Sequence, residues 1–98
     1  METMEYSIED NVAHLRFTRP EGANAVNPAF CRDLKLAVQE ISENNSVEAV
    51  VVTAEGKVFC AGGDLKEFKE AGDNLPAVVS AMLDDLHEAI YIMNAAPK

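Results

Sequence analysis

Alternating apolar and polar residues near the start of the chain predict a β-hairpin. Residues 4–8 and 12–18 form its two arms, and the turn-forming residues 9–11 separate them. The apolar positions of the second arm are Val12, Leu15 and Phe17. Because the alternation slips by one residue near Ala13, the pattern leaves a β-bulge or a shifted register open in this arm.

A helical period follows the hairpin. The segment RPEGANAVNPAF is rich in proline, glycine and asparagine, which is typical of a loop, and it ends with a helix start. Asn27 is a suitable N-cap, and Pro28 is tolerated in the first helical turn. Polar residues 44–46 should end the helix. Its apolar stripe consists of Phe30, Leu34, Ala37, Val38 and Ile41.

The rest of the chain reads as one more strand and two helices. Residues 47–53 are β-branched and almost continuously apolar, which predicts a central strand covered on both faces. Asp64 then caps a short helix, with Glu67 three residues further on. Pro76 suits the first turn of a long final helix, which Pro97 should stop. The apolar stripe of that helix consists of Val79, Met82, Leu83, Leu86, Ile90 and Met93.

These elements, in the order strand, strand, helix, strand, short helix and long helix, predict an α/β fold in a single domain over residues 1–98. The formal net charge of −9 would repel nucleic acid and an anionic lipid surface, so neither is expected as a partner. The longest apolar run, residues 49–52, is far shorter than the roughly 20 residues of a membrane span. The acidic N-terminus lacks the features of a signal peptide, which favours a cytoplasmic location.

The cysteines and histidines show no spacing typical of a metal site, so no metal is expected. In the cytoplasm Cys31 and Cys60 would be free thiols. Cys60 is a candidate nucleophile with His14 or His87 as its base, but its apolar neighbours favour a buried, inert thiol. His87 is expected on the surface of the last helix.

The sequence FCAGGD, residues 59–64, contains the strongest candidate for a chemical site. It follows an apolar strand and opens a capped helix, and ligands of α/β proteins bind beyond the carboxyl ends of such strands. The main-chain N–H groups of Ala61, Gly62 and Gly63 would have no strand partner there, and such donors can stabilise an oxyanion. The alternative is a glycine turn that only redirects the chain. The segment matches neither a P-loop nor a dinucleotide-binding motif.

Three segments together, FTRPEGANAVNPAF, VEAVVVTAEGKVFCAGGDLKEF and AAPK, resemble the N-terminal portion of the crotonase superfamily, also called the enoyl-CoA hydratase and isomerase family. The resemblance covers the whole chain. It implies a spiral of ββα turns, of which residues 1–98 would be the first turns only. It also implies a homo-oligomer, a trimer or hexamer, for the full-length protein.

The resemblance further implies an acyl-CoA thioester as substrate, with no separate cofactor. The N–H of Ala61 would be the first oxyanion donor, and Gly62, Gly63 and Asp64 would line the same site. Residues 21–25 resemble the segment that contacts the CoA nucleotide, which makes Ala23 and Ala25 further candidates. The second donor and the acid–base glutamates would lie beyond Lys98, so the chain alone is expected to be inactive.

Two classes of function remain open at this stage. The first is part of an enzyme that acts on an acyl-CoA. The reaction of such enzymes is most often hydration of an enoyl-CoA, and isomerisation, decarboxylation and thioester hydrolysis are the alternatives. The second is a non-catalytic binding or assembly module. The cationic residues nearest the motifs are Arg19, Lys57, Lys66 and Lys69. Each of them either attracts the phosphates of CoA or is an ordinary solvated side chain.

Overall fold

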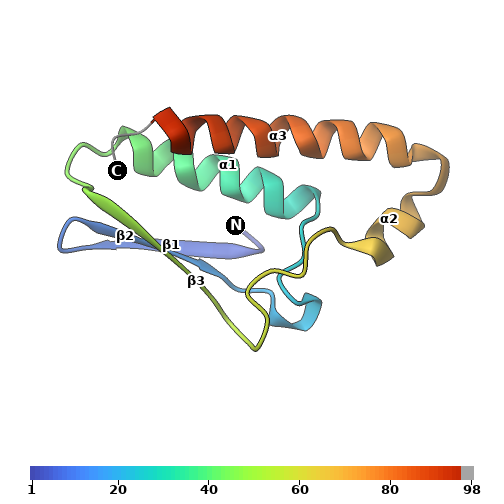
Figure 1. Ribbon diagram of the computed structural model, residues 1–98, viewed down its shortest axis with the longest axis horizontal. Helices are drawn as coiled ribbons and strands as arrows, with labels where there is room; N and C mark the ends of the chain where they lie inside the picture. The colour runs from blue at the N-terminus through green and yellow to red at the C-terminus, as the bar shows by residue number, and fades with distance from the viewer. Residues whose placement is uncertain (96–98) are drawn as a thin grey trace.

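The computed structural model describes residues 1–95, except for the side chain of Leu65. Figure 1 shows α1 lying between the sheet and α3. The order of elements agrees with the sequence prediction, although the predicted stop at Pro97 lies outside the described residues. The elements are β1 (Met4–Glu9), β2 (Val12–Phe17), α1 (Pro28–Glu43), β3 (Ala49–Ala54), α2 (Leu65–Ala71) and α3 (Leu75–Ala95), with short 3-10 helices at Pro20–Gly22 and Gly72–Asn74.

The hairpin of β1 and β2 has a regular register from Glu9 opposite Val12 to Met4 opposite Phe17, so neither the bulge nor the shifted register occurs. Asp10 and Asn11 form the turn with φ values of 51° and 66°, which suits the right-handed twist of the strands. The apparent slip arises from counting Val12 as a core residue. The inward side chains of β2 are buried and consist of Ala13, Leu15 and Phe17.

Helix α1 supplies most of the core. The Asn27 Oδ1 accepts a hydrogen bond from the Phe30 N–H at 2.8 Å, which confirms the predicted N-cap. All five residues of the predicted stripe are buried, and the Phe30 ring meets Phe17 edge to face with centroids 4.9 Å apart. The buried Asp33 carboxylate accepts from the N–H and the hydroxyl of Thr3, which fastens the N-terminal segment to this helix.

Strand β3 is an edge strand, and the prediction that it is covered on both faces is wrong for residues 1–95. It pairs in parallel with β2, and no other described strand pairs with its outer edge. Val50, Val51 and Val52 are 38%, 44% and 37% exposed. The β-branched side chains of these valines favour an extended backbone. Whether the strand is covered depends on which elements pack against the sheet, and α1 lies over the side of the sheet formed by β1 and β2.

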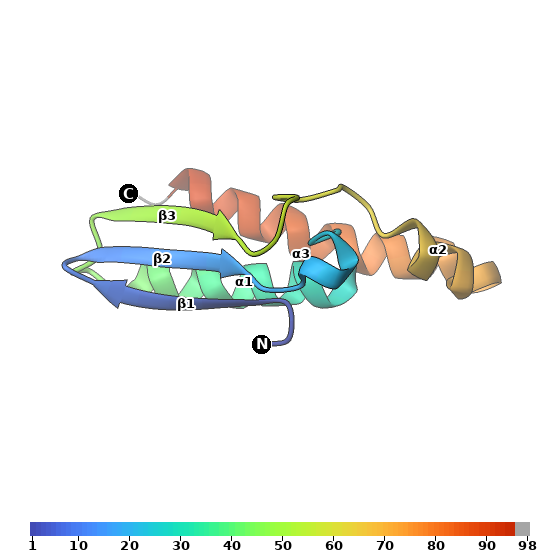
Figure 2. The same cartoon turned by 90° about the horizontal axis from the view of Figure 1, so that it is seen from below.

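Helix α3 packs along α1 through a narrower stripe than predicted. Met82 and Ala89 are buried, whereas Leu83, Ile90 and Met93 are 36%, 45% and 48% exposed. The difference arises because α3 meets α1 on one side and projects beyond the sheet at its N-terminal end (Figures 1 and 2). An ion pair of 2.7 Å between the Lys35 ammonium and the Asp85 carboxylate borders this contact.

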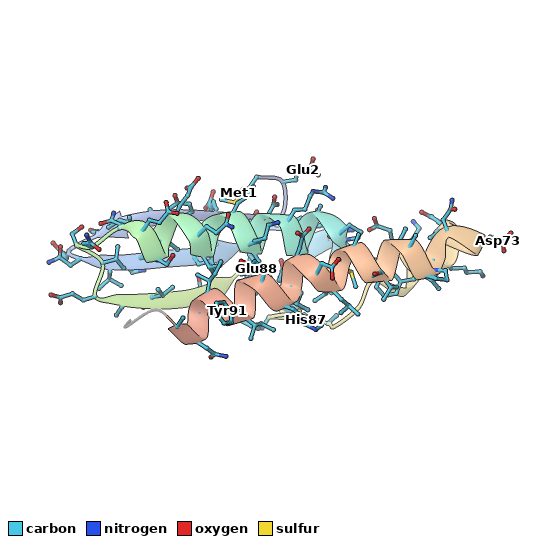
Figure 3. The ribbon with its side chains drawn as sticks, turned by 90° about the horizontal axis from the view of Figure 1, so that it is seen from above. Met1, Glu2, Asp73, His87, Glu88 and Tyr91 are labelled. Carbon is cyan, nitrogen blue, oxygen red and sulfur yellow. The ribbon has the colours of Figure 1, made fainter. Side chains whose placement is uncertain are left out.

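The face of α3 that points away from α1 includes His87 and Tyr91 (Figure 3). Both side chains are exposed, as predicted for His87. Among residues 1–95, no helix combines the length and the apolar character that crossing a membrane would require.

The two thiols have different surroundings. Both cysteines are free, but the buried one is Cys31, and Cys60 is only half-buried, contrary to the sequence prediction. Burial, with the Asp85 charge as a smaller cause, raises the pKa of the Cys31 thiol to about 11. At pH 8 only roughly one Cys31 thiol in a thousand is then ionised.

Iodoacetamide should therefore alkylate Cys60 at least about tenfold faster than Cys31 in the native chain, because Cys31 is both inaccessible and protonated. Mass spectrometry of peptides from a timed reaction measures both rates. In denaturant the two rates should become similar. Faster native alkylation of Cys31 would contradict the packing of α1 against α3.

Candidate functional site

Two loops meet at the carboxyl edge of the sheet. Because β2 and β3 are parallel, the loop 18–27 that leaves β2 and the loop 55–64 that leaves β3 start at the same edge (Figure 1). Three main-chain hydrogen bonds join them, and each involves a predicted site residue or its neighbour: Ala61 N–H to Ala23 O at 3.1 Å, Val26 N–H to Gly62 O at 2.6 Å, and Asp64 N–H to Val26 O at 2.9 Å. The structure thus brings the two predicted groups of site residues together.

The loop after β2 contains an unusual backbone. Ala23 and Asn24 both have left-handed conformations, with φ values of 53° and 51°. Ala25 is 7% exposed and donates its N–H to the Gly22 carbonyl at 3.1 Å, so its methyl group is part of the loop's interior. Non-glycine residues rarely adopt positive φ, and they cluster at functional loops.

The two adjacent glycines of FCAGGD are favoured by two different physical constraints. Gly62 has a φ of +89°, a conformation that side chains disfavour, and a Cβ added there would meet nothing within 4 Å. At Gly63 a Cβ would lie 2.9 Å from the Cε2 atom of the Phe68 ring. The first glycine therefore sets the direction of the chain, and the second lets the Phe68 ring approach the loop.

The donors of this loop differ in their availability. Among residues 1–95, no backbone or side-chain acceptor is found for the N–H groups of Gly62 and Gly63. The Ala61 N–H is directed to the Ala23 carbonyl instead. A ligand oxygen would have to replace that carbonyl in order to bind Ala61.

Asp64 confirms its predicted role as a helix cap. Its Oδ1 accepts from the Glu67 N–H at 3.1 Å, and its Oδ2 lies 3.3 Å from the Nη2 of Arg19. The Glu67 hydrogen bond, followed by the Arg19 guanidinium, holds the pKa of the Asp64 carboxyl below its usual value. Sequence reasoning did not anticipate the Arg19 pair, whose members are 45 positions apart.

A cavity of about 600 Å³ adjoins the two loops. Four carboxylates outnumber two cations around it, which is a poor complement to phosphate groups. The Nη1 atom of Arg19 is buried and has no partner among the described residues. Lys57 and Lys69 do not line this cavity. Its lining residues are Arg19, Glu21, Gly22, Asp64, Lys66, Glu67 and Glu70.

Sequence reasoning missed the role of Asn24. Its side chain is buried and joins the two loops through hydrogen bonds to Arg19, Glu55 and Val58. The signal that the sequence offered was an asparagine in a loop rich in glycine and proline, where asparagine tolerates left-handed backbone. In the described part of the chain, no cluster of three His, Cys, Asp or Glu side chains is suited to a metal ion.

Comparison with known proteins identifies the family of this chain. The sequence profile of the enoyl-CoA hydratase/isomerase family matches residues 7–96. The chain belongs to this family. Its fold agrees: the structure of an enoyl-CoA hydratase from Mycobacterium smegmatis, 28% identical, superposes with a TM-score of 0.86 over 99% of this chain and 37% of that one. The predicted crotonase-type α/β fold, as the N-terminal portion of a longer family member, is therefore confirmed.

Two relatives show how varied the family is. Over 68 residues the chain is 35% identical to a trans-2-decenoyl-acyl-carrier-protein isomerase of Streptococcus mutans, and the match covers 69% of this chain and 26% of that protein. Over 61 residues it is 43% identical to the mitochondrial Delta(3,5)-Delta(2,4)-dienoyl-CoA isomerase of Mus musculus, covering 62% of this chain and 19% of that protein. The chain thus spans only about a quarter or less of these family members.

The cap at Asp64 makes the stability of the loop depend on pH. Because the folded-state pKa of Asp64 is lowered, its contribution is present above the unfolded-state value of about 3.9 and is lost as pH falls through the folded-state value. Asp64→Asn keeps an oxygen for the cap but loses the charge. We expect the difference in unfolding free energy between wild type and Asp64→Asn to shrink as pH falls below about 4.

Urea unfolding at several pH values measures that difference. Asp84→Asn serves as the control, since Asp84 is exposed on α3 and has no hydrogen bond or ion pair among the described residues. A difference for Asp64→Asn that stays constant across the acid range would show that neither the Glu67 hydrogen bond nor the Arg19 pair favours the charged carboxylate in the folded state.

Proposed function

We propose that this chain supplies part of the acyl-CoA site of an enoyl-CoA hydratase or isomerase. In this proposal the Ala61 N–H is one donor to the thioester oxygen. The observation that carries it is the position of FCAGGD at the carboxyl edge of the sheet, joined to residues 23–26, in a chain of this family. Ligands of α/β proteins bind at such edges.

The bond between Ala61 and Ala23 gives this donor a useful energetic property. A neutral carbonyl of a bound thioester would replace the Ala23 carbonyl with little net gain, because one neutral hydrogen bond is exchanged for another. A negatively charged enolate oxygen forms a bond roughly twice as strong as a neutral one. The exchange therefore favours the charged intermediate over the substrate, which is the condition for lowering a barrier.

Acid–base chemistry has to come from groups other than the carboxylate in FCAGGD. A general acid or base works best when its pKa lies near the working pH. The pKa of Asp64 is shifted the other way, and both of its oxygens are occupied by the Glu67 N–H and Arg19. Asp64 is therefore a structural cap beside the ligand in this proposal, and not a general acid or base.

The purified chain should accordingly show no hydration of crotonyl-CoA above the buffer rate, because one oxyanion donor without positioned acid and base groups leaves the proton transfers uncatalysed. The loss of the absorbance of the conjugated thioester measures turnover. Clear activity of the chain would refute this division of roles.

Binding tests the ligand site directly, and two glycines provide a matched pair of variants. Gly62 and Gly72 both have positive φ, and a Cβ at either one would have no neighbour within 4 Å. An alanine at either position should cost about 1–3 kcal/mol of backbone strain. Only Gly62→Ala, however, places its methyl group on the loop that would contact the thioester.

We expect Gly62→Ala to weaken crotonyl-CoA binding roughly tenfold, and Gly72→Ala to leave it unchanged, at similar losses of stability. Isothermal titration calorimetry gives the affinities and urea unfolding gives the stabilities. If both variants lose affinity in proportion to stability, FCAGGD is only a turn and the proposed ligand site is wrong.

A second candidate function, an assembly module, is favoured by the exposed face of β3. Two of its exposed valines, Val50 and Val52, line an apolar cavity of about 310 Å³, which α1 and the end of α3 complete. Sedimentation with and without crotonyl-CoA separates the two candidates: an oligomer indifferent to the ligand supports assembly, and a monomer that binds it supports the ligand site. The cavity is lined by Leu15, Val38, Ile41, Ser42, Ala49, Val50, Val52, Ile92 and Met93.

A further inference from the structure

Asn24 has only 1% of its surface exposed, less than any other buried polar residue of the described chain. The other buried polar side chains act away from the two loops' contact: Asn27 caps α1, and Asp33 fastens Thr3 of the N-terminal segment to α1. Asn24 lies in neither a helix nor a strand. A buried amide must satisfy its hydrogen bonds, so the partners of this side chain define what it does.

Those partners lie on both loops of the candidate site. The Asn24 Oδ1 accepts from the Arg19 N–H at 2.9 Å, at the start of the loop after β2. Both hydrogens of its amide nitrogen cross to the loop after β3, donating to the carbonyls of Glu55 at 3.0 Å and Val58 at 2.9 Å. One side chain thus fixes the separation of two segments more than 30 positions apart.

The residues next to Asn24 transmit this constraint to FCAGGD. Ala23 precedes it and accepts from the Ala61 N–H, and Val26 exchanges main-chain bonds with Gly62 and Asp64. The left-handed backbone at positions 23 and 24 turns the chain so that these contacts form. Asparagine tolerates that conformation better than most residues and also supplies the amide.

The hydrogen bonds of Asn24 lie outside the hydrophobic core. The buried residues of the main core cluster come from β1, β2, α1 and α3. Loss of the Asn24 side chain should therefore loosen the two loops while the helices and the hairpin stay folded.

We propose that Asn24 is a positioning residue of the acyl-CoA site, which acts through Val26 and its main-chain bonds to Gly62 and Asp64 to hold the segment that carries the Ala61 N–H. This inference rests on the function proposed above. Asn24 does not contact the reacting atoms in this account. Its contribution is to remove the freedom that the donor loop would otherwise lose on binding.

Amide hydrogen exchange of the chain, followed by NMR, tests the proposal without ligand. In Asn24→Ala the protection of the Ala61 N–H should fall roughly tenfold, as expected for the loss of hydrogen-bonded order, while the amides of α1 and β2 keep theirs. Asn44→Ala is the matched control, because Asn44 holds Ser46 by a 3.0 Å bond near the opposite edge of the sheet. It should leave Ala61 unchanged.

A second variant adds a readout that a purely structural role would not produce. Asn24→Asp keeps the acceptor for Arg19 but faces the Glu55 and Val58 carbonyls with a carboxylate at neutral pH. When protonated, the introduced carboxyl can donate one bond to those carbonyls. Protection of Ala61 and affinity for crotonyl-CoA should therefore both rise as pH is lowered in this variant and not in wild type.

The two measurements, amide exchange and crotonyl-CoA binding, separate failure of this inference from failure of the proposed function. If wild type does not bind crotonyl-CoA, the function is wrong, and the exchange data alone decide the role of Asn24. Unchanged protection of Ala61 in Asn24→Ala, or an Asn24→Asp variant insensitive to pH, would overturn the inference. So would failure of both variants to fold, since Asn24 would then belong to the core of the fold.

Discussion

Parallel pairing of β2 with β3 is the constraint on which the candidate site depends. It places the carboxyl ends of both strands at one edge of the sheet, so that the loops leaving them start as neighbours. The short bridge between Val26 and Gly63 extends this pairing beyond the strands. Sequence positions near 24 and near 61 therefore meet.

Around that constraint the chain is packed unevenly. The face of the sheet under α1 is buried, and the phenylalanines of β2 and α1 meet there. A buried valine contributes about 1.5–3 kcal/mol, and the three valines of β3, each more than a third exposed, gain only part of that. The hairpin and α1 therefore hold the chain together, while β3 and its loop are positioned largely by hydrogen bonds to neighbouring segments.

Local patterns predicted local structure well. The cap at Asn27, the stripe on α1 and the cap at Asp64 depend on residues within one or two helical turns, and each is confirmed. Coverage of β3 and the contact face of α3 depend on which elements pack together, and the apolar pattern does not contain that information. Val12 shows the same limit within a strand, since Ala13 and not Val12 faces the core.

The candidate site shows the same limit. The sequence singled out FCAGGD as a candidate from its glycines, its position after a strand and its cap. The role of Asn24 could not be predicted in this way, because its partners are backbone carbonyls 31 and 34 positions away, and any residue type has such a carbonyl. The sequence also did not predict the hydrogen bond from the Ala61 N–H to the Ala23 carbonyl, although a ligand would have to replace that carbonyl in order to bind the N–H.

Difference infrared spectroscopy of crotonyl-CoA, isotope-labelled at the thioester carbonyl, tests the central claim most directly. A hydrogen bond from the Ala61 N–H would polarise the bound carbonyl and lower its stretching frequency relative to free ligand. We predict such a shift on binding to the chain and its loss in Gly62→Ala. A bound thioester whose carbonyl absorbs at the frequency of the free ligand would contradict the account.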